Sequence, residues 1–191
     1  AGGNQAVALL ANTGATMAAL YVLILALAPI SGAHFNPAVT LAMTSLRRLP
    51  APEAALYIVV QFAAMVAGAM LAHAMFELSL IQISGKVRSG EAQSLAEAVA
   101  TSGLLLTILL VERRRPDAIA AAVACWIGGA YWFTASTSFA NPAITAARML
   151  SDTFAGIAPA AVPGFVLGQL GGVLLALAVA RLLQGRLIDT A

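Results

Sequence analysis

The chain has little charge and a single cysteine. Charged residues make up 9% of its 191 positions, hydrophobic residues make up 61%, and the mean hydropathy is +0.91. A soluble domain of this size needs far more charge to cover its surface. The only cysteine, Cys125, excludes an internal disulfide, and we expect it to pack in the core of an apolar span. The scarcity of charge therefore predicts an integral membrane protein.

Patterns for catalysis and metal binding are also missing from the sequence. It contains no histidine and cysteine set with metal-ligand spacing, no nucleophile motif and no phosphate-binding glycine loop. The formal net charge of +2 is too small to indicate a nucleic-acid partner. We therefore expect no enzyme activity, no cofactor, no metal site and no nucleic-acid binding.

Long apolar runs are present instead. A bilayer core about 30 Å thick needs roughly 20 apolar residues per helical span. Continuous runs indicate α-helices, because a membrane β-barrel would show short segments of alternating hydrophobicity. Five stretches meet the requirement, at about residues 5–30, 56–76, 95–111, 116–136 and 159–181. The sequence therefore predicts an all-α membrane bundle, and the first run is too long and lacks the basic leader of a signal peptide.

The basic residues gather in three connections. These hold Arg47 and Arg48, then Arg113, Arg114 and Arg115, and finally Arg181 and Arg186. If a short segment after Asn36 enters the membrane and returns to the same side, all three connections face one compartment. The positive-inside rule identifies that compartment as the cytoplasm. Lys86 and Arg88 would then lie on the opposite side.

One motif occurs twice in the chain. "NPAVTLA" begins at Asn36 and "NPAITAA" begins at Asn141, and three predicted spans separate them, so the copies would enter the membrane from opposite faces. Asn is a favoured N-cap, and Pro suits the first helical position. The segments that follow, "AVTLAMTSL" and "AITAARML", are too short to span. We expect two half-helices that meet at their N-termini.

Two helix N-termini that face a narrow lumen favour neutral solutes. Each end carries roughly half a positive charge and therefore opposes cations. The side chains of Asn36 and Asn141 can donate N–H hydrogen bonds to a passing oxygen atom. The extended stretches "SGAHF" and "STSFA" leave backbone carbonyls as acceptors, which is tolerable at this depth only beside a wet cavity. The pattern predicts a single-file path for polar neutral molecules.

On these motifs the chain resembles the aquaporins and aquaglyceroporins, the major intrinsic protein family, over essentially its whole length. "SGAHFNPAVT" and the second "NPA" carry the resemblance. It implies a homotetramer in which each chain forms one aquaporin-like channel domain over residues 1–191, with repeats at 1–76 and 95–183. It also implies pore motifs formed by Asn36, Pro37, Ala38, Asn141, Pro142 and Ala143.

The resemblance assigns roles to three further polar residues. Glu97 corresponds to the family's buried acid that holds backbone groups of the second re-entrant loop, and Gln61 to its third-span glutamine. His34 corresponds to the loop histidine beside the first asparagine. The family has six full spans and the sequence shows five, so the first span is missing. We therefore expect the functional chain to extend further at its N-terminus.

The selectivity filter departs from the family pattern. Most members have Arg directly after the second motif, where this chain has Ile144. Counting from the asparagines places Thr16, Gly129 and Ser138 at the other three filter positions, where strict water channels have Phe, His and a small residue. A small shift along the fifth span would bring Tyr131 or Trp132 there and narrow the pore. A wide filter without arginine should pass a larger and less polar solute than water.

The β-branched residue at the arginine position and "SDTFAGIAP" at residues 151–159 resemble a subset of bacterial aquaglyceroporins found with arsenic-resistance genes. We interpret the chain as a passive channel in the bilayer of a bacterial inner membrane. Its solutes would be water and small neutral molecules, both polyols such as glycerol and metalloid hydroxides such as arsenous acid.

Two alternatives stay open at this point. Inverted repeats with broken helices also occur in ion-coupled secondary transporters. Such a transporter needs ionisable groups inside the membrane, and the candidates His34, His73 and Glu97 do not cluster by spacing. The other alternative is an inactive fragment of a channel. Flux that saturates and accumulates solute would indicate a transporter, and linear flux a channel.

Overall fold

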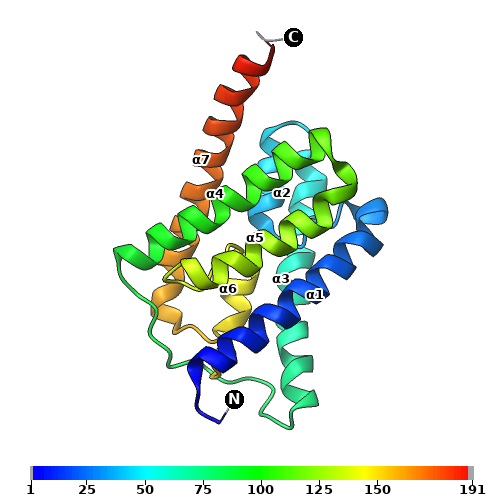
Figure 1. Ribbon diagram of the computed structural model, residues 1–191. Coiled ribbons are helices and arrows are strands. Elements are labelled where there is room, and N and C mark those ends of the chain that lie inside the picture. Colours follow the sequence, from blue (N-terminus) through cyan, green and yellow to red (C-terminus); the bar gives the residue numbers. More distant parts are fainter. Residues whose placement is uncertain (1, 189–191) are drawn as a thin grey trace.

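The computed structural model describes the backbone of residues 2–188 and the side chains of residues 2–183. These residues form one helical bundle without strands (Figure 1). The helices are α1 (Gln5–Ser31), α2 (Pro37–Ser45), α3 (Ala51–Met75), α4 (Glu91–Arg114), α5 (Ile119–Phe133), α6 (Pro142–Arg148) and α7 (Val162–Ile188), with 3-10 turns η1 (Pro116–Ala118) and η2 (Pro159–Ala161). The prediction of an all-α fold is confirmed.

Four helical stretches in the described part of the chain are long and apolar enough to cross a membrane. They are α1, α3, α4 and the stretch Pro159–Leu183 that contains η2 and most of α7. The fifth predicted span, residues 116–136, is present in a shorter form, because η1 precedes a 15-residue α5. At 1.5 Å per residue, α5 is about 22 Å long, which is less than the thickness of a bilayer core.

The half-helices α2 and α6 meet inside the bundle. Each contacts the other, and each also contacts both α3 and α7. Around them, α4 packs along α7, and α1 packs along α5. The two copies of the repeated motif therefore occupy matching places between the same pair of long helices.

The contact between α4 and α7 depends on glycine. A Cβ atom added at Gly168 would lie 2.2 Å from the carbonyl oxygen of Ser94, and one added at Gly172 would lie 2.6 Å from that of Ala98. Only glycine lets the two backbones approach this closely. On α3, by contrast, a Cβ at Gly68 would meet no atom within 4 Å.

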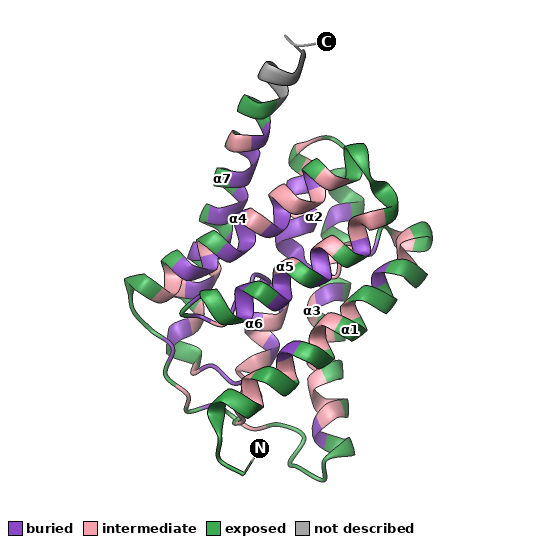
Figure 2. Ribbon diagram, viewed as in Figure 1, coloured by how far each residue is buried: buried purple, intermediate pink, exposed green. Residues whose placement is uncertain are grey.

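Burial in this protein is the reverse of that in a soluble domain. Large apolar side chains such as Leu10, Leu71 and Leu174 are 61%, 62% and 70% exposed, while Glu97, Thr145 and Gln169 are completely buried. Figure 2 shows much exposed surface along α1, α3 and α7. An apolar exterior is what lipid contact requires, and the buried polar groups mark the interior as the functional region.

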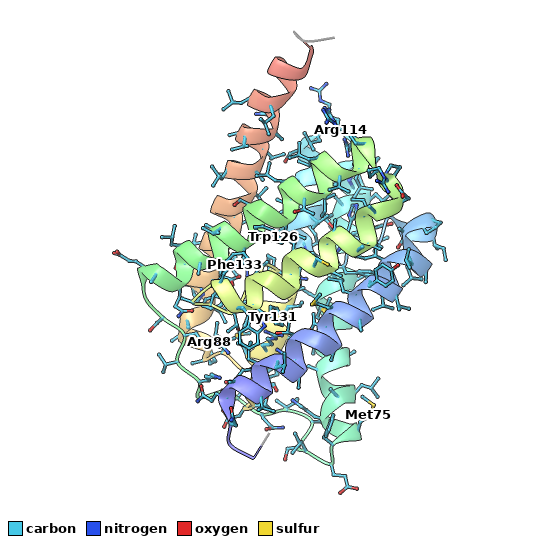
Figure 3. All side chains as sticks on the ribbon, in the orientation of Figure 1. Met75, Arg88, Arg114, Trp126, Tyr131 and Phe133 are labelled. Atoms are coloured by element: carbon cyan, nitrogen blue, oxygen red, sulfur yellow. The ribbon has the colours of Figure 1, made fainter. Side chains whose placement is uncertain are left out.

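The basic connections lie at one end of the bundle. Arg48, after α2, forms an ion pair with Glu112 near the end of α4. In Figure 1 the C-terminal ends of α4 and α7 point toward this same end. Arg114 and Arg88 lie at opposite ends in Figure 3. The side chain of Arg186 lies outside the described residues.

Candidate functional site

A cavity of about 890 Å³ runs between α1, α4, α5 and the two half-helices. Asn36 and Asn141 both line it, as do the predicted filter residues Thr16, Ser138 and Ile144. Charged side chains line its other end, where Arg48, Glu53 and Glu112 are found. The cavity therefore passes the meeting point of the half-helices.

Both half-helices begin as their sequence predicts. Asn36 is extended, with φ of −153°, and its Oδ1 accepts a hydrogen bond of 2.8 Å from the backbone N–H of Ala38. Asn141 is extended with φ of −155°, and its Oδ1 accepts from the N–H groups of Ala143 at 2.9 Å and Ile144 at 3.2 Å. Proline occupies the first position of each helix, at residues 37 and 142, where its missing N–H costs nothing.

The two asparagines also connect the copies of the motif. Nδ2 of Asn36 donates a 2.7 Å hydrogen bond to the carbonyl oxygen of Ala140, and Nδ2 of Asn141 donates a 2.8 Å bond to that of Phe35. An asparagine amide carries two N–H groups. One from each residue is thus used in this connection, and one remains for a solute, so each asparagine offers a single donor to the cavity.

The segments before the asparagines share an unusual backbone. Ala33 and Phe35 have φ of 48°, and the matching residues Ser138 and Ala140 have φ of 47°. Left-handed conformations cost about 1–2 kcal/mol for residues other than glycine. Such strain persists where the surrounding structure holds it, and it is typical of functional sites.

Glu97 holds the second of these segments. Its fully buried carboxyl group accepts hydrogen bonds of 2.8 Å from the N–H of Phe139 and 2.7 Å from the N–H of Ala140. It also accepts a 2.6 Å bond from Nε2 of Gln169. These bonds satisfy backbone donors that no helix or strand uses.

A pair of glutamines anchors the half-helices to the long helices. Nε2 of Gln61 donates to Oγ1 of Thr40, and Nε2 of Gln169 donates to Oγ1 of Thr145, both at 2.9 Å. His34 lies beside the first pair, with Nδ1 3.1 Å from Oγ1 of Thr40. Sequence reasoning found Gln61 but missed Gln169, although the threonine shared by "NPAVT" and "NPAIT" was a usable signal.

Three of the four predicted filter residues line the cavity. Ser138 is 1% exposed, and its buried Oγ has no hydrogen-bond partner among the described residues. Oγ1 of Thr16 accepts a 3.4 Å hydrogen bond from the hydroxyl of Tyr131. Ile144 faces the cavity and also packs against a buried cluster that contains Phe139.

The structure does not bring Gly129 to the cavity. From α5 the cavity is lined by residues that recur at every fourth position: Ile119, Val123, Ile127 and Tyr131. At 100° per residue, position 129 lies on the other side of the helix, where it is exposed. The same exposed side holds Cys125, so the expectation that Cys125 packs in the core is wrong.

Two further ionisable residues, His73 and Arg148, lie outside the cavity. His73 is buried, with Nδ1 2.8 Å from the carbonyl oxygen of Leu80 and Nε2 2.9 Å from Oγ of Ser151. The guanidinium of Arg148 lies 4.3 Å from the ring centroid of Phe139. Neither His73 nor Arg148 lines the cavity.

A helical membrane bundle in which two half-helices meet at an internal cavity is the architecture of a membrane channel or transporter. Comparison with known proteins identifies its family. The model of the family described as "Major intrinsic protein" matches residues 2–116. Aquaglyceroporin AqpS of Rhizobium meliloti (strain 1021) is 50% identical over 178 residues, which cover 93% of this chain and 76% of that protein.

A more distant relative is the probable aquaporin AqpM of Archaeoglobus fulgidus. It is 33% identical over 151 residues, which cover 73% of this chain and 61% of that protein. The chain belongs to the major intrinsic protein family. It is accordingly a multi-pass membrane channel for water and small solutes, and it is not an enzyme.

Proposed function

We propose that the protein is a passive channel with a permissive filter that conducts glycerol-like polyols and metalloid hydroxides such as arsenous acid as well as water. The observation that carries the proposal is Ile144, which lines the cavity in the first turn of α6, where most family members have arginine. An isoleucine offers neither charge nor hydrogen-bond donors. Solute selection at this point therefore depends on size and apolar contact.

The polar groups that remain at the cavity suit a small molecule with several hydroxyl groups. Asn36 and Asn141 each present one N–H donor, and Ser138 at the cavity wall has a buried hydroxyl, without a partner among the described residues, that a passing solute would satisfy. Ile144 and Ile127 supply apolar contact on the cavity wall. Glycerol and arsenous acid are both neutral, carry three hydroxyl groups and are similar in size. The same set of donors and acceptors would thus serve both.

Tyr131 sets an upper limit on solute size in this proposal. It takes the place that Gly129 was predicted to hold, and its hydroxyl bonds to Thr16 across the cavity lining. The proposed filter therefore comprises Thr16, Tyr131, Ser138 and Ile144. A tyrosine ring makes this filter narrower than one with glycine, so it would admit three-carbon polyols and slow longer ones.

Comparison and residue chemistry both favour this reading over coupled transport. The relative that is 50% identical is named an aquaglyceroporin, which supports polyol conduction. A secondary transporter would need free ionisable groups at the cavity to bind a driving ion. Glu97 and His73 do not line the cavity: Glu97 bonds to the loop amides and Gln169, and His73 bonds to Leu80 and Ser151. His34 does line it and lies beside Thr40, while the charged lining residues Arg48, Glu53 and Glu112 lie at the end away from the filter.

We also propose the setting in which the channel works. The end that carries Arg48 and Arg114 would face the cytoplasm of a bacterium, and the domain formed by residues 1–191, with its repeats at 1–76 and 95–183, would sit in the inner membrane. Four copies would associate through exposed apolar helix faces. Gly68 on α3 is exposed and leaves room for a close helix contact.

Flux through proteoliposomes tests the proposal. Stopped-flow light scattering with inward gradients of glycerol or arsenous acid should show swelling whose rate rises linearly with the gradient. Saturation at millimolar solute, or accumulation against a gradient, would point to a transporter. Fast water flux with no flux of glycerol or arsenous acid would show that the protein conducts water alone.

A further inference from the structure

The connection between α3 and α4, residues 76–90, lies against the end of α6 and the loop after it. The backbone N–H of Gln82 donates to the carbonyl oxygen of Leu150 at 3.0 Å, and that of Ser84 donates to Met149 at 2.9 Å. These bonds satisfy carbonyls at the C-terminus of the half-helix, which have no partner inside a helix. The connection therefore forms part of the wall around the second half-helix.

Arg88 extends from this connection into the protein. Its side chain donates four hydrogen bonds, two of them to the later loop: Nε to the carbonyl oxygen of Gly156 at 2.9 Å and Nη2 to that of Phe154 at 3.2 Å. Nη1 donates to the carbonyl oxygen of Ser136 at 3.2 Å and to Oγ1 of Thr137 at 3.3 Å. The residue is only 8% exposed.

The bonds from Nη1 reach the segment that carries a proposed filter residue. Ser136 and Thr137 directly precede Ser138, a residue of the cavity wall with a left-handed backbone. A planar guanidinium holds several acceptors in one fixed arrangement. Arg88 thus fixes the backbone from which Ser138 reaches the cavity.

The charge of Arg88 also lies close behind the cavity wall. Its Cζ is 5.2 Å from the ring centroid of Phe139, which lines the cavity. Burial and the neighbouring charge of Arg148 lower the pKa of Arg88 to about 10, while Glu97 acts in the opposite direction. The guanidinium therefore stays protonated at neutral pH, and a buried charge is weakly screened.

We propose that Arg88 is a specificity-determining residue of the channel, acting from outside the repeated motifs. Its hydrogen bonds position Ser138, and its positive charge opposes cations at a filter in which Ile144 carries no charge. The inference rests on the proposed function, because it takes the conducted solutes to be neutral. The two effects can be separated, because lysine keeps the charge but cannot reproduce the fork of hydrogen bonds.

The test compares Arg88→Lys and Arg88→Met with the parent protein in proteoliposomes. Water and glycerol permeability are measured by stopped-flow light scattering, and potassium leak is measured with a trapped fluorescent indicator. Lys86→Met is the matched control, since Lys86 belongs to the same connection and bonds to the same carbonyl of Phe154, at 2.7 Å. It makes no bond to residues 136–138.

Both Arg88 variants should change the glycerol-to-water permeability ratio by about threefold or more, because each loses the bonds to Ser136 and Thr137. Only Arg88→Met should raise potassium leak, by about tenfold, since it alone removes the charge. The control should match the parent in both measurements. An unchanged glycerol-to-water ratio together with an unchanged potassium leak in both Arg88 variants would overturn the proposal. The proposal would also fail if neither variant gave a monodisperse peak in size-exclusion chromatography, because Arg88 would then be a residue required for folding.

Labelling at Ser138 provides a readout that does not depend on the solute. In a Cys125→Ala background, Ser138→Cys is labelled with a small methanethiosulfonate reagent, with and without Arg88→Lys. The labelling rate should change by about threefold when Arg88 is replaced, and an equal rate would contradict the positioning role. If the parent conducts water but no glycerol, the proposed solute class fails, while potassium leak and labelling still decide the role of Arg88.

Discussion

The side-chain amide of Asn36 donates a hydrogen bond to the backbone carbonyl of Ala140, and the side-chain amide of Asn141 donates the matching bond to the backbone carbonyl of Phe35. Each asparagine caps its own half-helix with its side-chain oxygen and uses one side-chain N–H to hold the backbone of the other repeat. The two halves of the pore are thereby joined where their helix N-termini meet. The same residues serve the fold and the solute, because each amide has a second N–H left for the cavity.

Replacing Asn36 by Asp should separate these roles. The substitution keeps an acceptor for the N–H of Ala38 but leaves the carbonyl of Ala140 without its donor. An unsatisfied buried carbonyl costs about 1–3 kcal/mol, so the melting temperature in detergent should fall by several degrees, and the negative charge should raise potassium leak. Asn4→Asp is the matched control, because Asn4 is an exposed cap whose Oδ1 alone is used, at 3.1 Å from the N–H of Val7. Equal melting temperatures for the two variants would contradict the bracing role.

Glu97→Gln should lower stability and reduce all fluxes together. Phe139 and Ala140 donate to different carboxylate oxygens of Glu97, so a glutamine in the same place would put its NH₂ group against one of these backbone N–H groups. We expect a loss of about 1–3 kcal/mol, measured by thermal unfolding, with water and glycerol permeability reduced by similar factors. Glu91→Gln, at the exposed start of the same helix, should change neither quantity. A selective loss of glycerol flux would assign Glu97 to the filter instead.

Tyr131→Ala and Gly129→Leu test which face of α5 lines the pore. Removal of the tyrosine ring should widen the filter and increase the permeability of a four-carbon polyol several-fold relative to glycerol. Gly129→Leu should leave all permeabilities unchanged, because a Cβ there meets only the Phe133 ring, at 3.6 Å. Stopped-flow swelling rates for both polyols check the pair. If Gly129→Leu instead blocked the pore, the assignment of Gly129 to the filter from sequence spacing would be correct.

The half-helices could be predicted because their signals are local. Asn36 and Asn141 each precede a proline and an apolar segment too short to span, so cap, start and length are all contained in about ten residues. The inverted arrangement then followed from the number of spans between them. Nothing in this inference required knowledge of a distant contact.

The face of α5 could not be predicted in the same way. The position of Gly129 was obtained by counting back from Asn141 across residues 134–140, which include left-handed residues at Thr137, Ser138 and Ala140. Such a segment has no fixed rise or rotation per residue, so a count through it does not determine which face of the preceding helix points inward. At about 100° per residue, an error of two positions in the count moves the assigned residue to the opposite face of the helix.

Contacts made over long sequence distances were also beyond sequence reasoning. The charge pattern placed Arg88 at the end of the molecule opposite Arg114, where the structure has it (Figure 3). Its bonds to residues 136–137 and 154–156 depend on the path of a connection without regular structure. The partners of Asn36 and Asn141 in the opposite repeat were hidden for the same reason, although the motifs themselves were plain.

The central claim is that Ile144 makes the filter permissive, and the most direct test is stopped-flow light scattering on proteoliposomes of the parent and of Ile144→Arg. An arginine at this position would narrow the cavity and select by hydrogen bonding. The account predicts that glycerol and arsenous acid permeability fall about tenfold or more while water permeability falls much less. Equal suppression of all three, or no change in any, would contradict the assignment of Ile144 to the filter.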